Sequence, residues 1–218
     1  MDVSIRHDVR KKSSMKFRKQ KPQKRRGQSL VEFTVLLPLL LMMISGLIEF
    51  GFMLNYYLDM IDAAREAARF AADDDPIRLP SGAYLDPNPG FYTRAQTVTL
   101  DSINIGSGGQ ITLDPTSDDV IISAFSVLNG TVNQRYPAGS GENGLPLYGN
   151  HVSEYSTATI NSLLDPAAPN AGLVLVEIFY DYNQILALPW ITMFVPDPVT
   201  LHAYSIMPNA NVEPTPTP

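Results

Sequence analysis

The chain has 218 residues, no cysteine and a formal net charge of −6, and this sum combines two segments of opposite charge. Residues 1–26 contain eleven of the sixteen basic residues and two acids, which gives +9, whereas residues 27–218 contain five arginines, no lysine and twenty acids, which gives −15. The absence of cysteine excludes disulfide scaffolds, thiolate zinc sites, cysteine nucleophiles and iron–sulfur clusters.

The basic N-terminal segment, residues 1–27, is predicted to be a disordered cytoplasmic leader. Its low apolar content cannot bury enough surface to offset the entropy of ordering it. A basic tail can bind nucleic acid by neutralising phosphates. However, only Phe17 offers an aromatic ring for base stacking, and a long apolar segment follows. We therefore expect a targeting role for this segment and no nucleic-acid partner.

The apolar segment from Leu30 to Leu58 predicts a single membrane-spanning helix. Its uncharged part, Phe33–Ile48, is sixteen residues long and lies between Glu32 and Glu49. At about 1.5 Å per residue it spans roughly 24 Å, and with its flanks it covers a hydrocarbon core of about 30 Å. The basic residues precede it, so the positive-inside rule places the N-terminus in the cytoplasm. The alternative is a buried helix of a soluble protein, which would leave the charge asymmetry unexplained.

The same helix is expected to continue beyond the membrane, over residues 28–75, with the spanning part ending at about residue 55. Apolar residues recur at helical spacing after that point: Leu54, Tyr57, Leu58, Ile61, Ala64, Ala68 and Ala71. Asp73, Asp74 and Asp75 place negative charge at the unfavourable end of the helix dipole, and Pro76 follows. From Gln28 to Ala72 the helix would be on the order of 65 Å long, with a bend expected at Pro38.

The remainder, residues 76–211, is predicted to be an extracytoplasmic α+β domain with a small antiparallel sheet. Asn129-Gly130 between two strand-like runs, residues 119–127 and 131–136, predicts a hairpin with a type I′ turn. Residues 173–182 and 199–207 predict two further strands, and residues 152–164 a short helix. Residues 92–105 fit a helix and a strand about equally well. Residues 212–218 predict an extended Pro/Thr tail with almost nothing to bury.

Motifs of catalysis or cofactor binding do not occur in the sequence, so we expect neither an enzyme nor a cofactor. His7, His151 and His202 are isolated from one another, and no zinc-protease, nucleophile-elbow or phosphate-loop motif is present. Asp114, Asp118 and Asp119 are calcium candidates, but their loop lacks the twelve-residue ligand pattern, so solvated loop acids are the favoured interpretation and no metal site is expected. Trp190 lies among aliphatic residues, which predicts either a packed side chain or a contact surface for a partner.

The segment Arg25-Arg26-Gly27-Gln28-Ser29-Leu30-Val31-Glu32 carries the sharpest local signal, because a glycine after a basic tail precedes a carboxylate at the start of an apolar helix. This pattern resembles the processing site of type IV pilin-like precursors. With EFTVLLPLLLMMISGLIEFG and AAREAARFAA it is similar to the N-terminal region of TadE-like pseudopilins of the Flp/Tad pilus system. The resemblance is specific over residues 27–72, looser over residues 172–207, and does not extend to residues 73–171.

The resemblance implies a function in assembly. A prepilin peptidase would cut between Gly27 and Gln28, and Glu32 would pair with the freed amine of Gln28 on a neighbouring subunit. The implied partners are the peptidase, other pilin or pseudopilin subunits, the inner-membrane assembly platform and the lipid bilayer. The implied location is the bacterial cytoplasmic membrane, with incorporation into a surface pilus. Phe33 stands where major pilins of this system favour tyrosine, which favours a minor subunit.

Other residues at the helix surface are candidates for packing. Pro38, Gly46, Glu49 and Gly51 are the candidate positions for helix packing or an interface, although ordinary membrane-helix composition explains the glycines equally well. Glu49 is expected either to reach the outer headgroups or to pair with another helix. For Glu32 the alternative is a tolerated residue at the membrane rim.

Three other classes of protein are considered, of which an extracytoplasmic enzyme is disfavoured by the lack of catalytic motifs. The first alternative to a minor pseudopilin is a single-pass anchored binding or sensory module that is never cut. The second is a secreted protein with a cleaved signal peptide. The length of the basic and apolar regions, together with Pro38 and Glu49, argues against a signal peptide.

Overall fold

The computed structural model describes residues 28–167 and 169–214. The chain forms two compact units, Met1–Leu41 and Met42–Pro218. The described part of the first unit is the beginning of α1 (Gln28–Ala72), and the second unit contains the rest of this helix and all other elements. The predicted disordered leader, residues 1–27, lies outside the described residues, as does the end of the predicted tail from residue 215.

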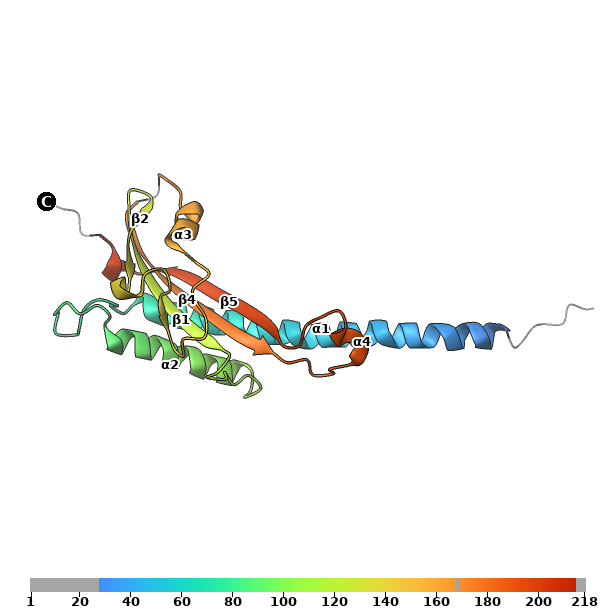
Figure 1. The fold of residues 1–218 in the computed structure, drawn as a ribbon. Coiled ribbons are helices and arrows are strands. Elements are labelled where there is room, and N and C mark those ends of the chain that lie inside the picture. The colour runs from blue at the N-terminus through green and yellow to red at the C-terminus, as the bar shows by residue number, and fades with distance from the viewer. Residues whose placement is uncertain (1–27, 168, 215–218) are drawn as a thin grey trace, which may run out of the picture. The chain divides into compact units, whose positions relative to one another are not determined.

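The long helix predicted from the sequence is confirmed as α1, which has Pro38 in its interior (Figure 1). It ends at Ala72, so Asp73, Asp74 and Asp75 follow the helix instead of extending it. Of the apolar stripe predicted after the membrane segment, the alanines are buried, whereas Leu54 and Leu58 are 42% and 51% exposed.

The predicted antiparallel sheet is confirmed. Its strands are β1 (Asp119–Leu128), β2 (Thr131–Tyr136), β3 (Leu145–Pro146), β4 (Ala171–Tyr182) and β5 (Val199–Pro208). The strand order is β2-β1-β4-β5, and β3 pairs with β1 at Ile121 and Ile122. The β1–β2 hairpin turns at Asn129 and Gly130, whose φ angles are 53° and 72°, as a type I′ turn requires.

The segment that the sequence left ambiguous between helix and strand is the helix α2 (Pro89–Gly106). Asn88 caps its N-terminus, because the side-chain oxygen of Asn88 accepts a hydrogen bond from the Gly90 amide at 3.1 Å. Pro89 occupies the first helical position, where no donor is lost. The short elements are α3 (Thr157–Leu163), α4 (Pro189–Thr192), η1 (Ala138–Ser140) and η2 (Ala210–Val212).

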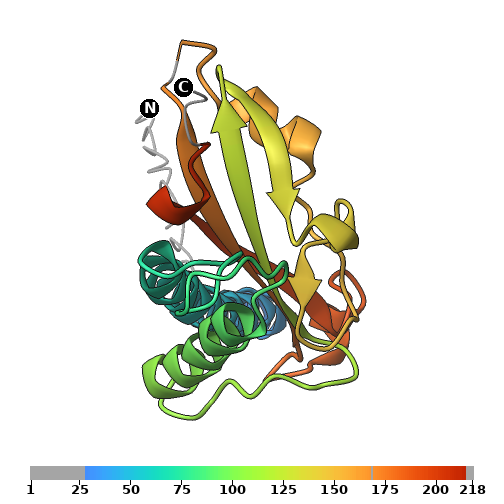
Figure 2. The ribbon, with the colours of Figure 1, turned by 90° about the vertical axis from the view of Figure 1, so that its left-hand side faces the viewer.

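The main core lies between one face of the sheet and the two helices α1 and α2 (Figure 2). The part of α1 that packs here presents small side chains, which let the helix approach the sheet closely. These buried residues are Met60, Ala63, Ala64, Ala67, Ala68 and Ala71. The other face of the sheet is covered around Phe125 and Leu175, where Ile160 from α3 packs.

The segment that follows β5 contacts the end of α1 through Asn209. The buried side chain of Asn209 donates hydrogen bonds to the Ala71 carbonyl in the last turn of α1 and to the Asp74 carbonyl just after it, both at 2.9 Å. Val212, which the sequence assigned to the tail, is only 3% exposed and packs with Ile77 and Ala124. The chain after Asn209 is therefore part of the folded domain at least as far as Val212.

Candidate membrane anchor and assembly site

The N-terminal part of α1 has an apolar and exposed surface. One stretch of this helix, within Ser29–Ala72, is long and apolar enough to cross a membrane, with a mean hydropathy of 2.2 and none of the window buried. The large side chains from Leu30 to Ile48 are between 37% and 71% exposed. Exposure of this much contiguous apolar surface is costly in water and favourable in lipid.

The residues predicted for processing and assembly lie at the beginning of α1. Gly27 is outside the described residues, and Gln28 is the first described residue and lies in α1. Glu32 follows about one helical turn later and is exposed, and Pro38 is also exposed. Their predicted roles concern contacts with a peptidase and with other subunits, and they stay predictions.

Gly46 and Gly51 present bare backbone on the helix surface. A Cβ atom built on either residue would meet no atom of the described chain within 4 Å. Neither glycine is therefore required by packing within the described residues. Their predicted use in close packing with another helix stays a prediction.

Glu49 has an arrangement that the sequence did not indicate. Its carboxylate is 5% exposed and accepts three hydrogen bonds, from the Tyr182 hydroxyl at 2.6 Å, the Ile185 amide at 2.9 Å and the Leu186 amide at 2.8 Å. We call this arrangement the Glu49 clasp. It joins α1 to the end of β4, so Glu49 has its partners within its own chain instead of in the lipid headgroups or on another helix.

Tyr182 completes the clasp from the sheet side. Its ring is 1% exposed and meets the Tyr56 ring edge-on at a centroid distance of 5.2 Å. Burial raises the pKa of Tyr182, and the hydrogen bond to Glu49 raises it further, because both favour the neutral hydroxyl. The hydroxyl is therefore a donor to Glu49 throughout the physiological pH range.

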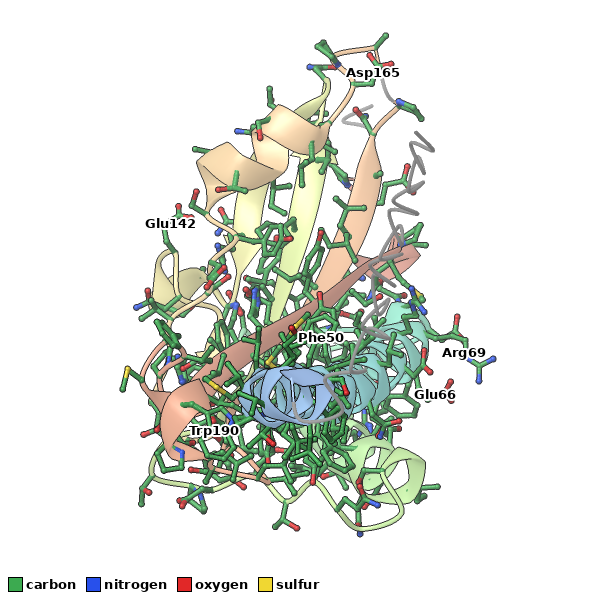
Figure 3. All side chains as sticks on the ribbon, turned by 90° about the vertical axis from the view of Figure 1, so that its right-hand side faces the viewer. Phe50, Glu66, Arg69, Glu142, Asp165 and Trp190 are labelled. Carbon is green, nitrogen blue, oxygen red and sulfur yellow. The ribbon has the colours of Figure 1, made fainter. Side chains whose placement is uncertain are left out.

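The clasp fixes the start of the β4–β5 loop, residues 183–198, which contains α4. Where the two ends of this loop meet, the side-chain amide of Gln184 donates hydrogen bonds to the Val195 and Pro196 carbonyls, both at 3.1 Å. The backbone amide of Gln184 donates to the Asp197 carboxylate at 3.0 Å. The indole nitrogen of Trp190 donates to the Ser45 hydroxyl at 3.0 Å. Figure 3 shows Trp190 on α4 beside α1.

The β4–β5 loop and α1 enclose an apolar pocket of about 160 Å³. Among its lining residues are Gly46, Phe50 and Met53 from α1, and Ile191 and Val195 from the loop. The loop therefore covers one side of the helix from Ser45 to Met53, a part that the sequence placed in the membrane-spanning segment. Sequence reasoning missed this contact because its two sides are more than 130 residues apart.

The acids that the sequence raised as calcium candidates are engaged by backbone groups. The Asp119 carboxylate accepts hydrogen bonds from the amides of residues 147–151, and Asp118 accepts from the amides of Asp114 and Asp181. Within residues 28–167 and 169–214, no group of three or more His, Asp or Glu residues is arranged to hold a metal ion. The Asp119 carboxylate therefore organises the loop that follows β3.

Comparison with known proteins identifies the beginning of the chain. Residues 27–69 match the family model described as TadE-like protein. This segment is TadE-like. The match confirms the resemblance over residues 27–69, whereas the looser resemblance over residues 172–207 stays a prediction. With the apolar helix, the match supports a membrane-anchored protein associated with the Tad pilus. No curated protein and no solved structure gives a significant match to the chain.

Proposed function

We propose that the chain is a minor pseudopilin of a Flp/Tad-type pilus or secretion system, cut by a prepilin peptidase between Gly27 and Gln28. The observation that carries this proposal is the TadE-like match, which begins at residue 27, beside the Gly27–Gln28 bond, and covers the apolar part of α1. Cutting there would release a helix in which Glu32 lies about one turn past the new N-terminus and is followed by apolar residues.

Glu32 is proposed to direct assembly in the membrane. A carboxylate in the centre of a bilayer costs roughly 2.5–3.5 kcal/mol on insertion scales, and less near an interface. Pairing with the new α-amine of Gln28 on a neighbouring subunit would offset this cost, because opposite charges attract strongly at low dielectric. The exposure of Glu32 on α1 is compatible with such an intersubunit contact.

The proposed location is the bacterial cytoplasmic membrane, with the N-terminus inside and the α+β domain outside. The charge difference between residues 1–26 and the rest of the chain supports this orientation. The absence of cysteine makes a direct test simple, because single cysteines can be introduced at Lys12 and at Asn143, each in Gly27→Leu so that the leader is retained. A membrane-impermeant maleimide is expected to label intact cells at position 143 and not at position 12. The reverse pattern would overturn the orientation.

Processing is tested by the mass of the membrane-bound protein. N-terminal sequencing is expected to begin at Gln28, and Gly27→Leu is expected to leave the full-length precursor, because a bulky side chain obstructs approach of the enzyme to the scissile bond. A wild-type chain that begins at Met1 in a strain with an active prepilin peptidase would overturn the proposed function in favour of an uncut anchored module.

Assembly is tested separately with Glu32→Gln. Glu66 is the matched control, since it is an exposed acid on the same helix with its own ion pair to Arg69 at 2.9 Å. We expect Glu32→Gln to be cut normally and to fail in co-purification with the other pilus subunits, whereas Glu66→Gln retains both properties. Wild-type co-purification of Glu32→Gln would remove the proposed pairing.

A further inference from the structure

We infer that the β4–β5 loop is a second membrane contact, in which α4 and the residues after it enter the outer headgroup region and the upper acyl chains of the bilayer that holds α1. The inference rests on the membrane anchor and is independent of cutting and of pilus assembly. Its partner is the lipid bilayer, and its central residues are Trp190, Met193 and Phe194.

The composition of the loop fits a lipid environment. Residues 183–196 form an uncharged run of fourteen residues, and acids stand just outside it at Asp181 and Asp197. Met193 and Phe194 are 76% and 79% exposed, and Ile185 is 49% exposed. A group of large apolar side chains that are this exposed to solvent indicates a contact with a membrane or with another protein.

The position of the loop identifies the membrane as this partner. The uncharged part of the anchor ends at Ile48, and the loop is held beside this end by the Trp190–Ser45 hydrogen bond and by the Glu49 clasp. On α1 itself, Leu47 and Phe50 lie next to Ser45 and Glu49 in the sequence and are 71% and 54% exposed. Figure 1 shows α4 beside α1, and both the helix and the loop therefore present exposed apolar side chains near the end of the uncharged part of the anchor.

The polar groups of the loop agree with this location. Tryptophan is enriched at membrane–water interfaces, where its ring meets acyl chains and its N–H has a polar partner. Backbone amides must also be satisfied before a segment can enter lipid. The amides of Thr192, Met193 and Val195 donate within the α4 turn, at 3.0–3.3 Å, and those of Ile185 and Leu186 donate to Glu49.

Trp190 provides the test, since it is the only tryptophan in the chain. The full chain is reconstituted in vesicles of phosphatidylethanolamine and phosphatidylglycerol, with lipids brominated at shallow or at deep acyl positions. We expect Trp190 to lose most of its emission to the shallow bromines, less to the deep ones, and little to aqueous acrylamide. Strong acrylamide quenching without bromolipid quenching, in protein that floats with the vesicles, would overturn the inference while leaving the anchor intact.

A relocated tryptophan serves as the internal control. In the double variant Trp190→Phe with Tyr84→Trp, the only indole lies at a position where the native side chain is 65% exposed in the loop before α2. This variant is expected to show the opposite pattern, with quenching by acrylamide and not by bromolipid. Equal bromolipid quenching at both positions would overturn the specific contact through the β4–β5 loop.

Phe194→Glu tests whether the exposed apolar side chains enter the lipid. The charge is expected to move Trp190 from bromolipid quenching toward acrylamide quenching, whereas Leu163→Glu, on the 62% exposed Leu163 of α3, leaves the signal unchanged. Unchanged quenching in Phe194→Glu would overturn the insertion. A Trp190 signal that depends on the ratio of protein to lipid, with weak bromolipid quenching, would assign the loop to a second copy of the chain and also overturn it.

Discussion

The Glu49 clasp makes a quantitative prediction for Glu49→Ala. This change removes the acceptor of three hydrogen bonds and leaves the Ile185 and Leu186 amides without their partner. Hydrogen bonds to a charged group contribute about 1.5–3 kcal/mol each, so the two amides alone give a loss on the order of 3–6 kcal/mol. The loss falls on the attachment of the β4–β5 loop, because the main core between the sheet and the helices is not touched.

Hydrogen exchange of the full chain in lipid nanodiscs measures this attachment. Since about 1.4 kcal/mol corresponds to a factor of ten, a loss of 3 kcal/mol or more makes the Ile185 and Leu186 amides exchange at least about 100-fold faster. Glu49→Gln should fall between the wild type and Glu49→Ala, because one carboxamide oxygen replaces two carboxylate oxygens. Glu66→Ala, on an exposed acid of the same helix, is the control and should leave both amides protected.

The reasoning would be refuted by wild-type exchange at these two amides in Glu49→Ala. Such a result would mean that the apolar contacts of the loop hold it closed without the carboxylate. Faster exchange spread evenly over β4 and β1 would equally contradict the argument, because it would make Glu49 a determinant of the whole domain instead of the loop.

The remaining predictions concern stability, compared as thermal unfolding of variants in one detergent. Asn209→Ala should cost about 1–3 kcal/mol, because it removes the donors to the carbonyls at the end of α1, whereas the exposed Asn211→Ala should change stability by less than about 0.5 kcal/mol. Equal effects would contradict the helix-end role. Tyr92 has a buried hydroxyl with no hydrogen-bond partner among the described residues, so Tyr92→Phe should leave stability unchanged or raise it by about 1 kcal/mol. Burial raises the pKa of Tyr92, so the hydroxyl stays neutral in the folded state while it begins to ionise in the unfolded state near its ordinary pKa of about 10. The free energy of unfolding of the wild type should therefore fall as the pH rises above about 10, and Tyr92→Phe should be less sensitive to alkaline pH. A Cβ atom on Gly172 would lie 1.9 Å from the Asn209 carbonyl oxygen, so Gly172→Ala should destabilise by at least about 1–3 kcal/mol, whereas Gly106→Ala, which has open space, should not.

Local patterns predicted much of this fold because they depend on neighbouring residues. The Asn129-Gly130 turn needs positive φ angles that these residue types tolerate, and the hairpin follows from it. The long helix was readable from its apolar run and its alanine spacing. The structure of residues 92–105 could not be predicted, since the spacing of their apolar residues fits the period of a helix and that of a strand. The deciding feature lies just upstream, where Asn88 caps and Pro89 begins the helix.

Contacts between distant parts of the chain could not be predicted in this way. Glu49 is one acid at the end of an apolar run, and nothing near it in the sequence indicates a tyrosine 133 positions later. Val212 begins a Pro/Thr tail by composition, yet the close approach of the chain at Gly172 brings it into the core. These contacts depend on strand order, which local periodicity does not encode.

The two acids that bound the apolar part of α1 have different environments, because Glu49 is buried and Glu32 is exposed. Three hydrogen bonds from its own chain engage the Glu49 carboxylate, which has room for about four in total. Glu32 lies on an exposed turn of the helix. An intersubunit pairing at Glu49 would have to break the clasp and release the β4–β5 loop. If the proposed function holds, Glu32→Gln should abolish subunit association and leave the Trp190 quenching unchanged. Glu49→Ala should instead alter the Trp190 quenching and leave subunit association intact. Loss of association in Glu49→Ala alone would reverse this assignment and make the loop, not the start of the helix, the determinant of assembly.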